Sequence, residues 1–246
     1  MEILLDELIL DNYESLHQDI TAVTKGIASW HGILTGIAMG DRRSHSAFKR
    51  AQVSQNDGEA ALLELCRKGI ISQELAKSRS FFEDVPVSNK LKFAVPFVRF
   101  WFAFISPIFK GIKEGDFEEF HIRFENHMQE FVTYIYEELF RELVKISFKD
   151  DAIVEMGGFW NKDIDIELFA KTTSGKVIAG TLKLSKEKMK KSELTKLQEK
   201  AESASLRPDI YVLFSKNGFS NELKGLKGEN LKLFSLKNFK TLADKE

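Results

Sequence analysis

The sequence of 246 residues predicts an α+β protein, in which N-terminal helices precede a mixed β-sheet flanked by helices. Apolar residues recur at helical spacing through much of residues 1–95 and again in 124–146. Apolar and polar residues then alternate with period two in 163–184, as in half-buried strands. We expect a winged helix-like domain at 1–95, an aromatic bridge at 96–119 and a sheet domain at 120–246.

The composition bounds the class of protein. The chain is 43% hydrophobic and 30% charged, with a formal net charge of -1, so only local patches could attract nucleic acid. Its single cysteine, Cys66, excludes an intramolecular disulfide and fits the cytoplasm. The most apolar segment, 97–109, is too short to span a bilayer, and no glycine-rich loop with GKS or GKT occurs. We therefore expect no membrane segment and no ATP site.

The N-terminal part predicts helices followed by a small hairpin. The expected helices are 8–22, 28–39, 44–52 and 57–68, and the expected strands begin at 70 and 91. In the last helix, Asn56 and Glu59 resemble a capping box, and Gly69 suits the left-handed position after a helix. This order suggests a winged helix-turn-helix, which docks on DNA or serves as a scaffold of the same shape.

The expected recognition helix is a poor partner for phosphate, because it carries Asp57, Glu59 and Glu64. A better candidate is the basic patch at and after the preceding turn, which comprises Arg42, Arg43, Lys49 and Arg50. Either this patch contacts phosphate or it is a solvated face, which is the commoner outcome for such clusters.

Aromatic residues are dense between Phe93 and Phe109. Rings at this density bury a large area and need a surface to pack on. The favoured interpretation is a seam between two domains. The alternative is a homodimer surface, since large exposed apolar patches mark partners.

The C-terminal part predicts a sheet with a helix before it and another inserted in it. The expected elements are an amphipathic helix of about six turns at 124–146, strands at 153–157, 163–170 and 176–184, a lysine-rich helix at 187–204, strands at 209–215 and 231–236, and a short helix at 238–243. The lysines in and before the inserted helix are Lys186, Lys188, Lys190, Lys191, Lys196 and Lys200.

The two central strands carry the candidate chemistry. Alternation places Asp165 and Glu167 on one side of the first strand, and Thr181 and Lys183 on one side of the second. Metal-dependent phosphodiester cleavage needs hard oxygen ligands for a divalent cation such as Mg²⁺ or Mn²⁺. It also needs stabilisation of the developing charge or the attacking water. Asp165 and Glu167 are the candidate metal ligands, and Lys183 is the candidate catalytic cation.

These motifs resemble the domain of unknown function at the C-terminus of bacterial and archaeal DEXX-box ATPases, a PD-(D/E)xK nuclease-like family. Phe159-Trp160 is similar to its tryptophan-containing turn, and Asp165–Ala170 to its E-I-D-hydrophobic-A motif with both acids exchanged. Gly180–Lys183 is similar to its G-E-x-K motif, with Thr181 in place of the glutamate. The resemblance implies that Glu137 is a helix-borne acid of the site, although its helical periodicity places it opposite the apolar stripe.

Three functional hypotheses follow. The first is a nucleic-acid-binding protein on a degenerate nuclease fold, with weak or absent catalysis and DNA contacts from the Arg42–Arg50 patch and from Lys186, Lys190 and Lys191. The second is an active Mg²⁺- or Mn²⁺-dependent endonuclease in which Asp165, Asp163 or Glu155 supplies the missing carboxylate. The third is a non-enzymatic assembly protein that dimerises through the aromatic bridge. An acid beside Lys183 would favour the second hypothesis.

Overall fold

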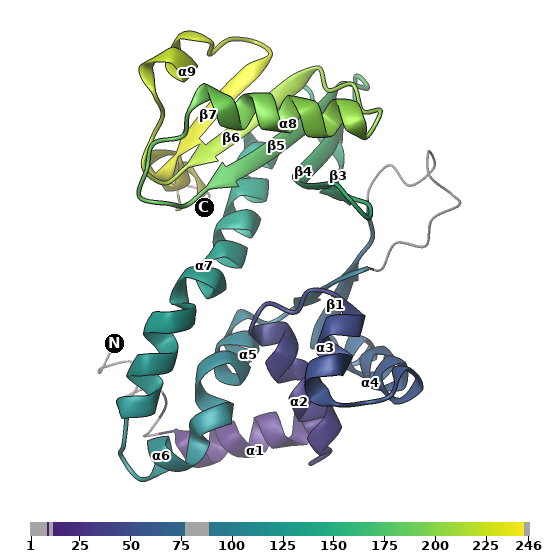
Figure 1. The fold of residues 1–246 in the computed structure, drawn as a ribbon, viewed down its shortest axis with the longest axis vertical. Helices are drawn as coiled ribbons and strands as arrows, with labels where there is room; N and C mark the ends of the chain where they lie inside the picture. The colour runs from purple at the N-terminus through teal and green to yellow at the C-terminus, as the bar shows by residue number, and fades with distance from the viewer. Residues whose placement is uncertain (1–8, 10–11, 77–88, 244–246) are drawn as a thin grey trace. The chain divides into compact units, whose positions relative to one another are not determined.

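The computed structural model describes residues 9, 12–76 and 89–243, which form two compact units (Figure 1). The first unit contains the described residues up to Glu74 and from Asn89 to Val132. The second unit contains Leu75, Ala76 and residues from Thr133 onward. The fold class is α+β, with N-terminal helices followed by a five-stranded mixed sheet flanked by helices.

The first unit begins with four helices and a two-stranded hairpin. The elements are α1 (Tyr13–Thr24), α2 (Ala28–Ala38), α3 (Ser44–Ala51), α4 (Gln55–Arg67), β1 (Ile71–Glu74) and β2 (Lys90–Phe93). β1 and β2 pair antiparallel, and an isolated bridge joins Arg43 to Lys90. The order is the one predicted for a winged helix.

The predicted cap of α4 is wrong by two residues. Ser54, rather than Asn56, precedes the helix, and its Oγ accepts a hydrogen bond from the Asp57 backbone N–H at 3.2 Å. The expected end is confirmed, because Gly69 has φ +70°. Serine caps an orphan backbone donor of the first turn, and glycine adopts the left-handed conformation without strain.

The aromatic run lies in the core of the first unit. It forms α5 (Pro96–Phe100), the π-helix η3 (Trp101–Ile105), the 3-10 helix η4 (Ser106–Ile108) and α6 (Phe109–Lys113). The side chains of Trp101, Phe102 and Phe104 are at most 1% exposed. Phe97 and Phe109 are exposed, so a dimer surface along this run would have to use them and not the buried rings.

Helix α7 (Glu118–Ser147) starts earlier than predicted and spans 30 residues. The division between the two units falls within it, after Val132. Its C-terminal half supplies Phe140, Leu143 and Val144 to the core of the second unit. The predicted apolar stripe is only partly confirmed: Leu143 packs here, but Ile135 is 40% exposed. Glu137, which periodicity placed opposite the stripe, is buried, as are Phe140 and Val144, so the buried side of the helix is turned from the predicted one.

The second unit is built on the sheet β3 (Ile153–Trp160), β4 (Asp165–Thr172), β5 (Val177–Lys183), β6 (Ile210–Ser215) and β7 (Leu231–Ser235), in that spatial order. β3, β4 and β5 are antiparallel, whereas β5, β6 and β7 are parallel. The parallel strands are connected by α8 (Lys191–Ser203) and α9 (Asn221–Gly225), and the chain continues through η5 (Leu236–Phe239) into α10 (Lys240–Ala243). α9 was not predicted.

The lysine-rich helix starts four residues later than predicted, at Lys191. The backbone N–H of Met189 donates to the carbonyl of Gly218 at 2.9 Å, and Met189 forms a parallel bridge with Phe219. This pairing holds the chain extended, so residues 184–190 are a loop. The lysine pattern alone does not reveal this bridge, because Phe219, the partner of Met189, lies 30 positions further along the chain.

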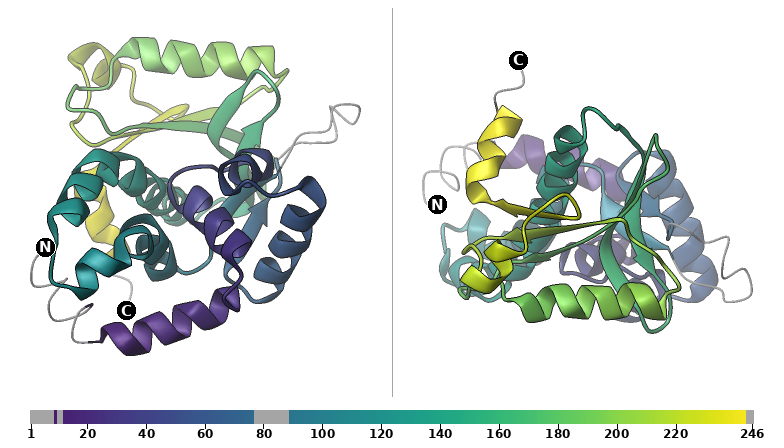
Figure 2. Two further views of the ribbon diagram at one scale, coloured as in Figure 1. Left: turned by 60° about the horizontal axis from the view of Figure 1, so that its bottom comes forward. Right: turned by 90° about the horizontal axis from the view of Figure 1, so that it is seen from above.

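The two faces of the sheet carry different helices, which Figure 2 shows from two further directions. α8 covers the face formed by Phe169, Ala179 and Leu213. The C-terminal half of α7 covers the opposite face, which includes Leu168, Ala170, Ile178, Val212 and Phe214. The predicted alternation in β5 is therefore confirmed.

The predicted alternation in β4 is interrupted at Ile166. The register passes from Gly157 opposite Phe169 to Phe159 opposite Ile166, so β4 has one extra residue between these pairs. Ile166 consequently packs in the same cluster as Phe169 and not with Leu168 and Ala170. A bulge of this kind redirects neighbouring side chains and is common beside functional sites.

Candidate functional site

The predicted site residues lie where β4 and β5 cease to pair. The two strands pair from Lys171–Val177 to Leu168–Gly180. Beyond that point, Asp165 and Ile166 pair with β3, whereas Thr181 to Lys183 pair with β6. We call this point the β4–β5 fork. Glu167, Thr181 and Lys183 all lie in it, whereas we expected them on two strands that face each other.

Cationic side chains from two helices satisfy backbone groups at the fork. Arg141 Nη2 of α7 donates to the Glu167 carbonyl at 3.1 Å, and Lys200 Nζ of α8 donates to the Asp165 carbonyl at 2.9 Å. Strand carbonyls without a partner are costly to bury, so these contacts stabilise the divergence of the strands. Neither cation was predicted to have this role.

Glu167 is held in a site that disfavours its charged form. Its side chain is half-buried, and Oε2 has no hydrogen-bond partner in the described part of the chain. Burial raises the pKa of the Glu167 carboxyl, and this effect outweighs the opposing contributions of the Lys200 charge and the Thr181 hydroxyl. Asp165 raises the pKa further by repulsion. A carboxyl that resists ionisation is a weakened metal ligand.

Lys183 has two carboxylate neighbours. Its Nζ is 3.6 Å from Glu193 Oε1 and 3.7 Å from Glu187 Oε2. Glu193 lies in the first turn of α8 and is 28% exposed, whereas Glu187 lies in the preceding loop and is 74% exposed. The more exposed pair is weakened more by solvent. Sequence reasoning missed both acids, although Glu193 is the acid of the first turn of α8.

The other predicted acids are dispersed. Asp165 is exposed, and Glu155 forms an ion pair with Lys171 at 3.6 Å. Glu137 is buried on α7, whose C-terminal half covers the face of the sheet opposite α8. Within the described residues, no group of three or more His, Cys, Asp or Glu side chains could hold a metal ion.

The basic patch of the first unit is largely engaged in local contacts. The Arg50 guanidinium forms an ion pair with Asp41, which contributes most to raising the pKa of Arg50. Arg42 and Arg43 are half-buried, and Lys49 is exposed. The charge of this patch is thus partly neutralised within its own unit.

The predicted basic residues of the second unit fall into two groups. Lys186 and Lys190 are exposed in the loop before α8. Lys191 begins α8 and forms an ion pair with Glu222 at 3.4 Å. The loop lysines therefore differ from the first helical lysine in having no such carboxylate partner within the described residues.

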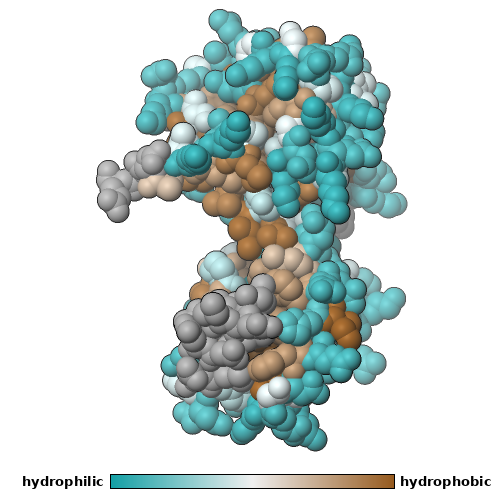
Figure 3. Space-filling model, turned by 90° about the vertical axis from the view of Figure 1, so that its left-hand side faces the viewer, coloured by the Kyte–Doolittle hydropathy of each residue, from teal (hydrophilic) through white to brown (hydrophobic). Residues whose placement is uncertain are grey.

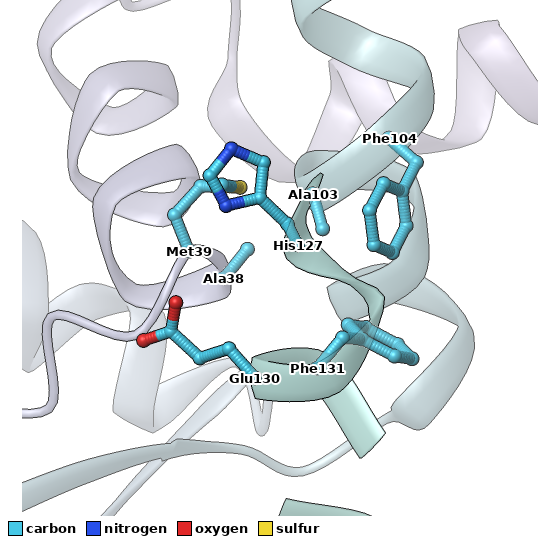
Figure 4. A pocket seen from close by; sticks show the side chains of 7 residues that line it. All are labelled: Ala38, Met39, Ala103, Phe104, His127, Glu130 and Phe131. Carbon is cyan, nitrogen blue, oxygen red and sulfur yellow. The ribbon is translucent and has the colours of Figure 1, made fainter. Parts of the chain in front are cut away.

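Two hollows of the first unit are weak candidates for a ligand site. One lies among α2, η3 and α7 and is drawn in Figure 4, with Met39, Phe104, His127 and Glu130 among its lining residues. It is too small for a water molecule. The other is an open groove of about 410 Å³ beside Trp30 and Asp57.

Comparison with known proteins gives a family match for part of the chain. Residues 101–197 match a family, DUF234, described as archaeal and bacterial proteins of unknown function. This segment includes α7, β3, β4, β5 and the start of α8, and so contains the β4–β5 fork. No curated protein and no solved structure matches the chain. None of the described helices is long and apolar enough to cross a membrane.

The raised pKa of the half-buried Glu167 carboxyl predicts a pH-dependent stability difference. We expect Glu167→Gln to stabilise the protein above about pH 5, because ionising Glu167 in the folded state is unfavourable. Its unfolded pKa is about 4.3, so the wild type loses stability as the pH rises from there through the raised folded pKa. The advantage of Glu167→Gln should disappear at about pH 3, where the carboxyl is protonated in both states.

Denaturant titrations at several pH values measure this difference. The expected gain in the free energy of unfolding is about 1.4 kcal/mol for each unit by which folding raises the pKa of the Glu167 carboxyl. Glu199→Gln is the control, because Glu199 is an exposed carboxylate on α8 and its removal changes the net charge equally. If both variants gain the same stability at each pH, the gain comes from the change in net charge. That result would contradict an effect of burial at Glu167.

Proposed function

We propose that the chain is a nucleic-acid-binding protein on a nuclease-like sheet, in which phosphodiester cleavage is weak or absent. The observation that carries this proposal is the state of the β4–β5 fork. Thr181 stands where the resemblance implies a second acid. Burial also raises the pKa of the Glu167 carboxyl, which weakens it as a ligand for a divalent cation.

The order of elements supports the nuclease-like ancestry. α7, the antiparallel strands β3 to β5, the crossover helix α8 and the parallel strand β6 follow the order that the resemblance implies. Fold alone does not define function. The order of elements supports the expectation that the fork residues correspond to the acids and lysine of a nuclease of this kind.

The metal chemistry is the weakest part of such a site. Mg²⁺ or Mn²⁺ would be held by Glu167 and Asp165, but Glu167 is half-buried with a raised pKa, and Asp165 lies beyond the bulge. Ligand charge largely sets the affinity for hard cations. We therefore expect weak metal binding, which agrees with the dispersed acids of the described residues.

One observation favours an active metal-dependent nuclease as the second candidate. Glu193 brings a carboxylate to 3.6 Å from Lys183, and it could replace the acid missing at Thr181. In that case the wild-type protein cleaves plasmid DNA with Mn²⁺, and both Glu193→Ala and Lys183→Ala abolish cleavage. Cleavage that survives in both variants would instead come from a contaminating nuclease or from another site.

Binding is the primary test of the proposal. We expect mobility shifts with DNA at low salt that weaken steeply as salt rises, because phosphate contacts release counterions. The titration should be run with duplex DNA and with single-stranded DNA. Each should be repeated with a chelator, which shows whether binding depends on a metal ion. Absence of binding to either form at low salt would overturn the proposed function.

A further inference from the structure

The carboxyl ends of β5 and β6 carry two loops that are joined to each other. The parallel strands of the sheet end at the same edge (Figure 1). Residues 184–190 follow β5, and residues 216–220 follow β6. Asn217 Nδ2 donates to the Ser185 carbonyl at 2.7 Å, and the Ser220 backbone N–H donates to the Met189 carbonyl at 2.9 Å. The loops therefore form one supported surface.

Four lysines project from this surface, and we call them the lysine shelf: Lys186, Lys188, Lys190 and Lys216. All four are exposed, and none has an ion-pair partner within the described residues. Met189 is 1% exposed in its bridge with Phe219, so the flanking Lys188 and Lys190 face the opposite way, toward solvent. The backbone pairing thus determines the outward direction of two of the four charges.

The lysines of α8 differ from those of the shelf. Lys191 pairs with Glu222 and Lys196 with Glu193, and Lys200 donates to the Asp165 carbonyl. The ammonium groups of these three lysines therefore interact with groups of the second unit itself. The structure thereby separates lysines that form one basic run in the sequence, and it adds Lys216, which lies far from that run.

We propose that the lysine shelf is a binding surface for the phosphate backbone of duplex nucleic acid. This inference rests on the proposed function and assigns it to a defined surface. The carboxyl ends of β5 and β6 lie at one edge, so the loops that follow them bring these lysines onto one surface. Concentrated positive charge on a protein of net charge -1 creates a local field that attracts a polyanion.

The chemistry of the shelf favours a duplex over a single strand. Single-strand binding surfaces usually add exposed aromatic rings on which bases stack. The two loops contain one aromatic residue, Phe219, and it is 6% exposed. Lysines that contact phosphates position a duplex without reading its bases. The shelf should therefore bind different duplex sequences with similar affinity. Figure 3 shows hydrophilic side chains around the rim of the second unit, with hydrophobic ones between them.

The test compares two triple variants of equal charge change in the full chain. The shelf variant is Lys186→Gln, Lys188→Gln and Lys216→Gln, and it retains Lys190, which directly precedes α8. The control is Lys176→Gln, Arg207→Gln and Lys227→Gln, three exposed cations in the loops that precede β5, β6 and β7. The control thus removes charge at the opposite edge of the same parallel strands.

The readout is the dissociation constant of a fluorescent duplex over a range of salt concentrations, for two unrelated sequences and one single strand. We expect the shelf variant to reduce the slope of log K against log salt by about 1 for each phosphate that its lysines no longer neutralise, thus by up to about 3. Binding should weaken alike for both duplexes, and the control should keep the wild-type slope.

The outcomes distinguish this inference from the proposed function. If the wild type binds the duplex and the shelf variant keeps its slope, the shelf is not the surface, while nucleic-acid binding stands. If the wild type binds no nucleic acid, the proposed function fails as well. Salt-sensitive binding to phosphatidylserine vesicles but not to duplex would replace the nucleic acid by a lipid surface and overturn the inference.

Discussion

Gly180→Ala is expected to destabilise the protein by about 1–3 kcal/mol, and Gly180→Val by more, because overpacking of a well-packed core is costly. A Cβ at position 180 would lie 2.6 Å from Val212 Cγ2 and 2.9 Å from the Val212 carbonyl oxygen. The side-chain atom could move, but the carbonyl belongs to the neighbouring central strand. Against a typical domain stability of about 5–15 kcal/mol, this loss is large.

Denaturant unfolding measures the effect, and Gly225→Ala is the matched control. A Cβ on Gly225 meets no atom within 4 Å, and its backbone has no positive φ. This control should unfold at the wild-type midpoint or slightly above it. A wild-type midpoint for Gly180→Val would show that β5 and β6 can separate without cost and would contradict the packing described here.

Gly180 also shows what local sequence can and cannot predict. Period-two alternation predicted β5 and the faces of its side chains, because both depend on residues next to one another. The need for glycine at this position comes from Val212, which lies 32 positions away and reaches it only after α8 has crossed the sheet. The family resemblance identified Gly180 as a motif residue, but its physical role required the register of β6.

The bulge in β4 limited the site prediction in the same way. Asp165 and Glu167 were expected on one face because they are two residues apart. The extra residue opposite Gly157 to Phe159 interrupts that relation, as Ile166 shows by packing with Phe169. A bulge arises from pairing between strands, so the sequence of β4 alone contains no signal for it.

Charge partners were the least predictable feature. Lys183 was named from the sequence as a candidate site residue, but its carboxylate neighbours, which come from a loop and from α8, were missed. Likewise, helical periodicity cannot separate Lys191, which has a carboxylate partner, from the shelf lysines before it. Both distinctions depend on where α8 begins, and the bridge between Met189 and Phe219 sets that point.

Thr181→Glu is expected to raise the affinity for Mn²⁺ by at least about tenfold, because ligand charge largely sets the affinity of hard-cation sites. Thr181 already lies close enough to Glu167 for its hydroxyl to lower the pKa of that carboxyl. A carboxylate there would place two acids beside each other at the fork. Calorimetric titration of Mn²⁺ measures the change. Thr195→Glu adds the same charge at an exposed position of α8 and should leave the affinity unchanged.

Plasmid nicking then tests whether the fork still supports catalysis. A well-placed electrostatic group is typically worth about a hundredfold or more in rate, so Thr181→Glu should increase Mn²⁺-dependent nicking by that order if Lys183 can reach the phosphate. Adding Glu193→Gln to Thr181→Glu removes the closer carboxylate partner of Lys183 and should increase nicking further. Robust wild-type cleavage that Glu167→Ala or Lys183→Ala abolishes would show that the natural site is intact. The active-nuclease hypothesis would then replace the degenerate one.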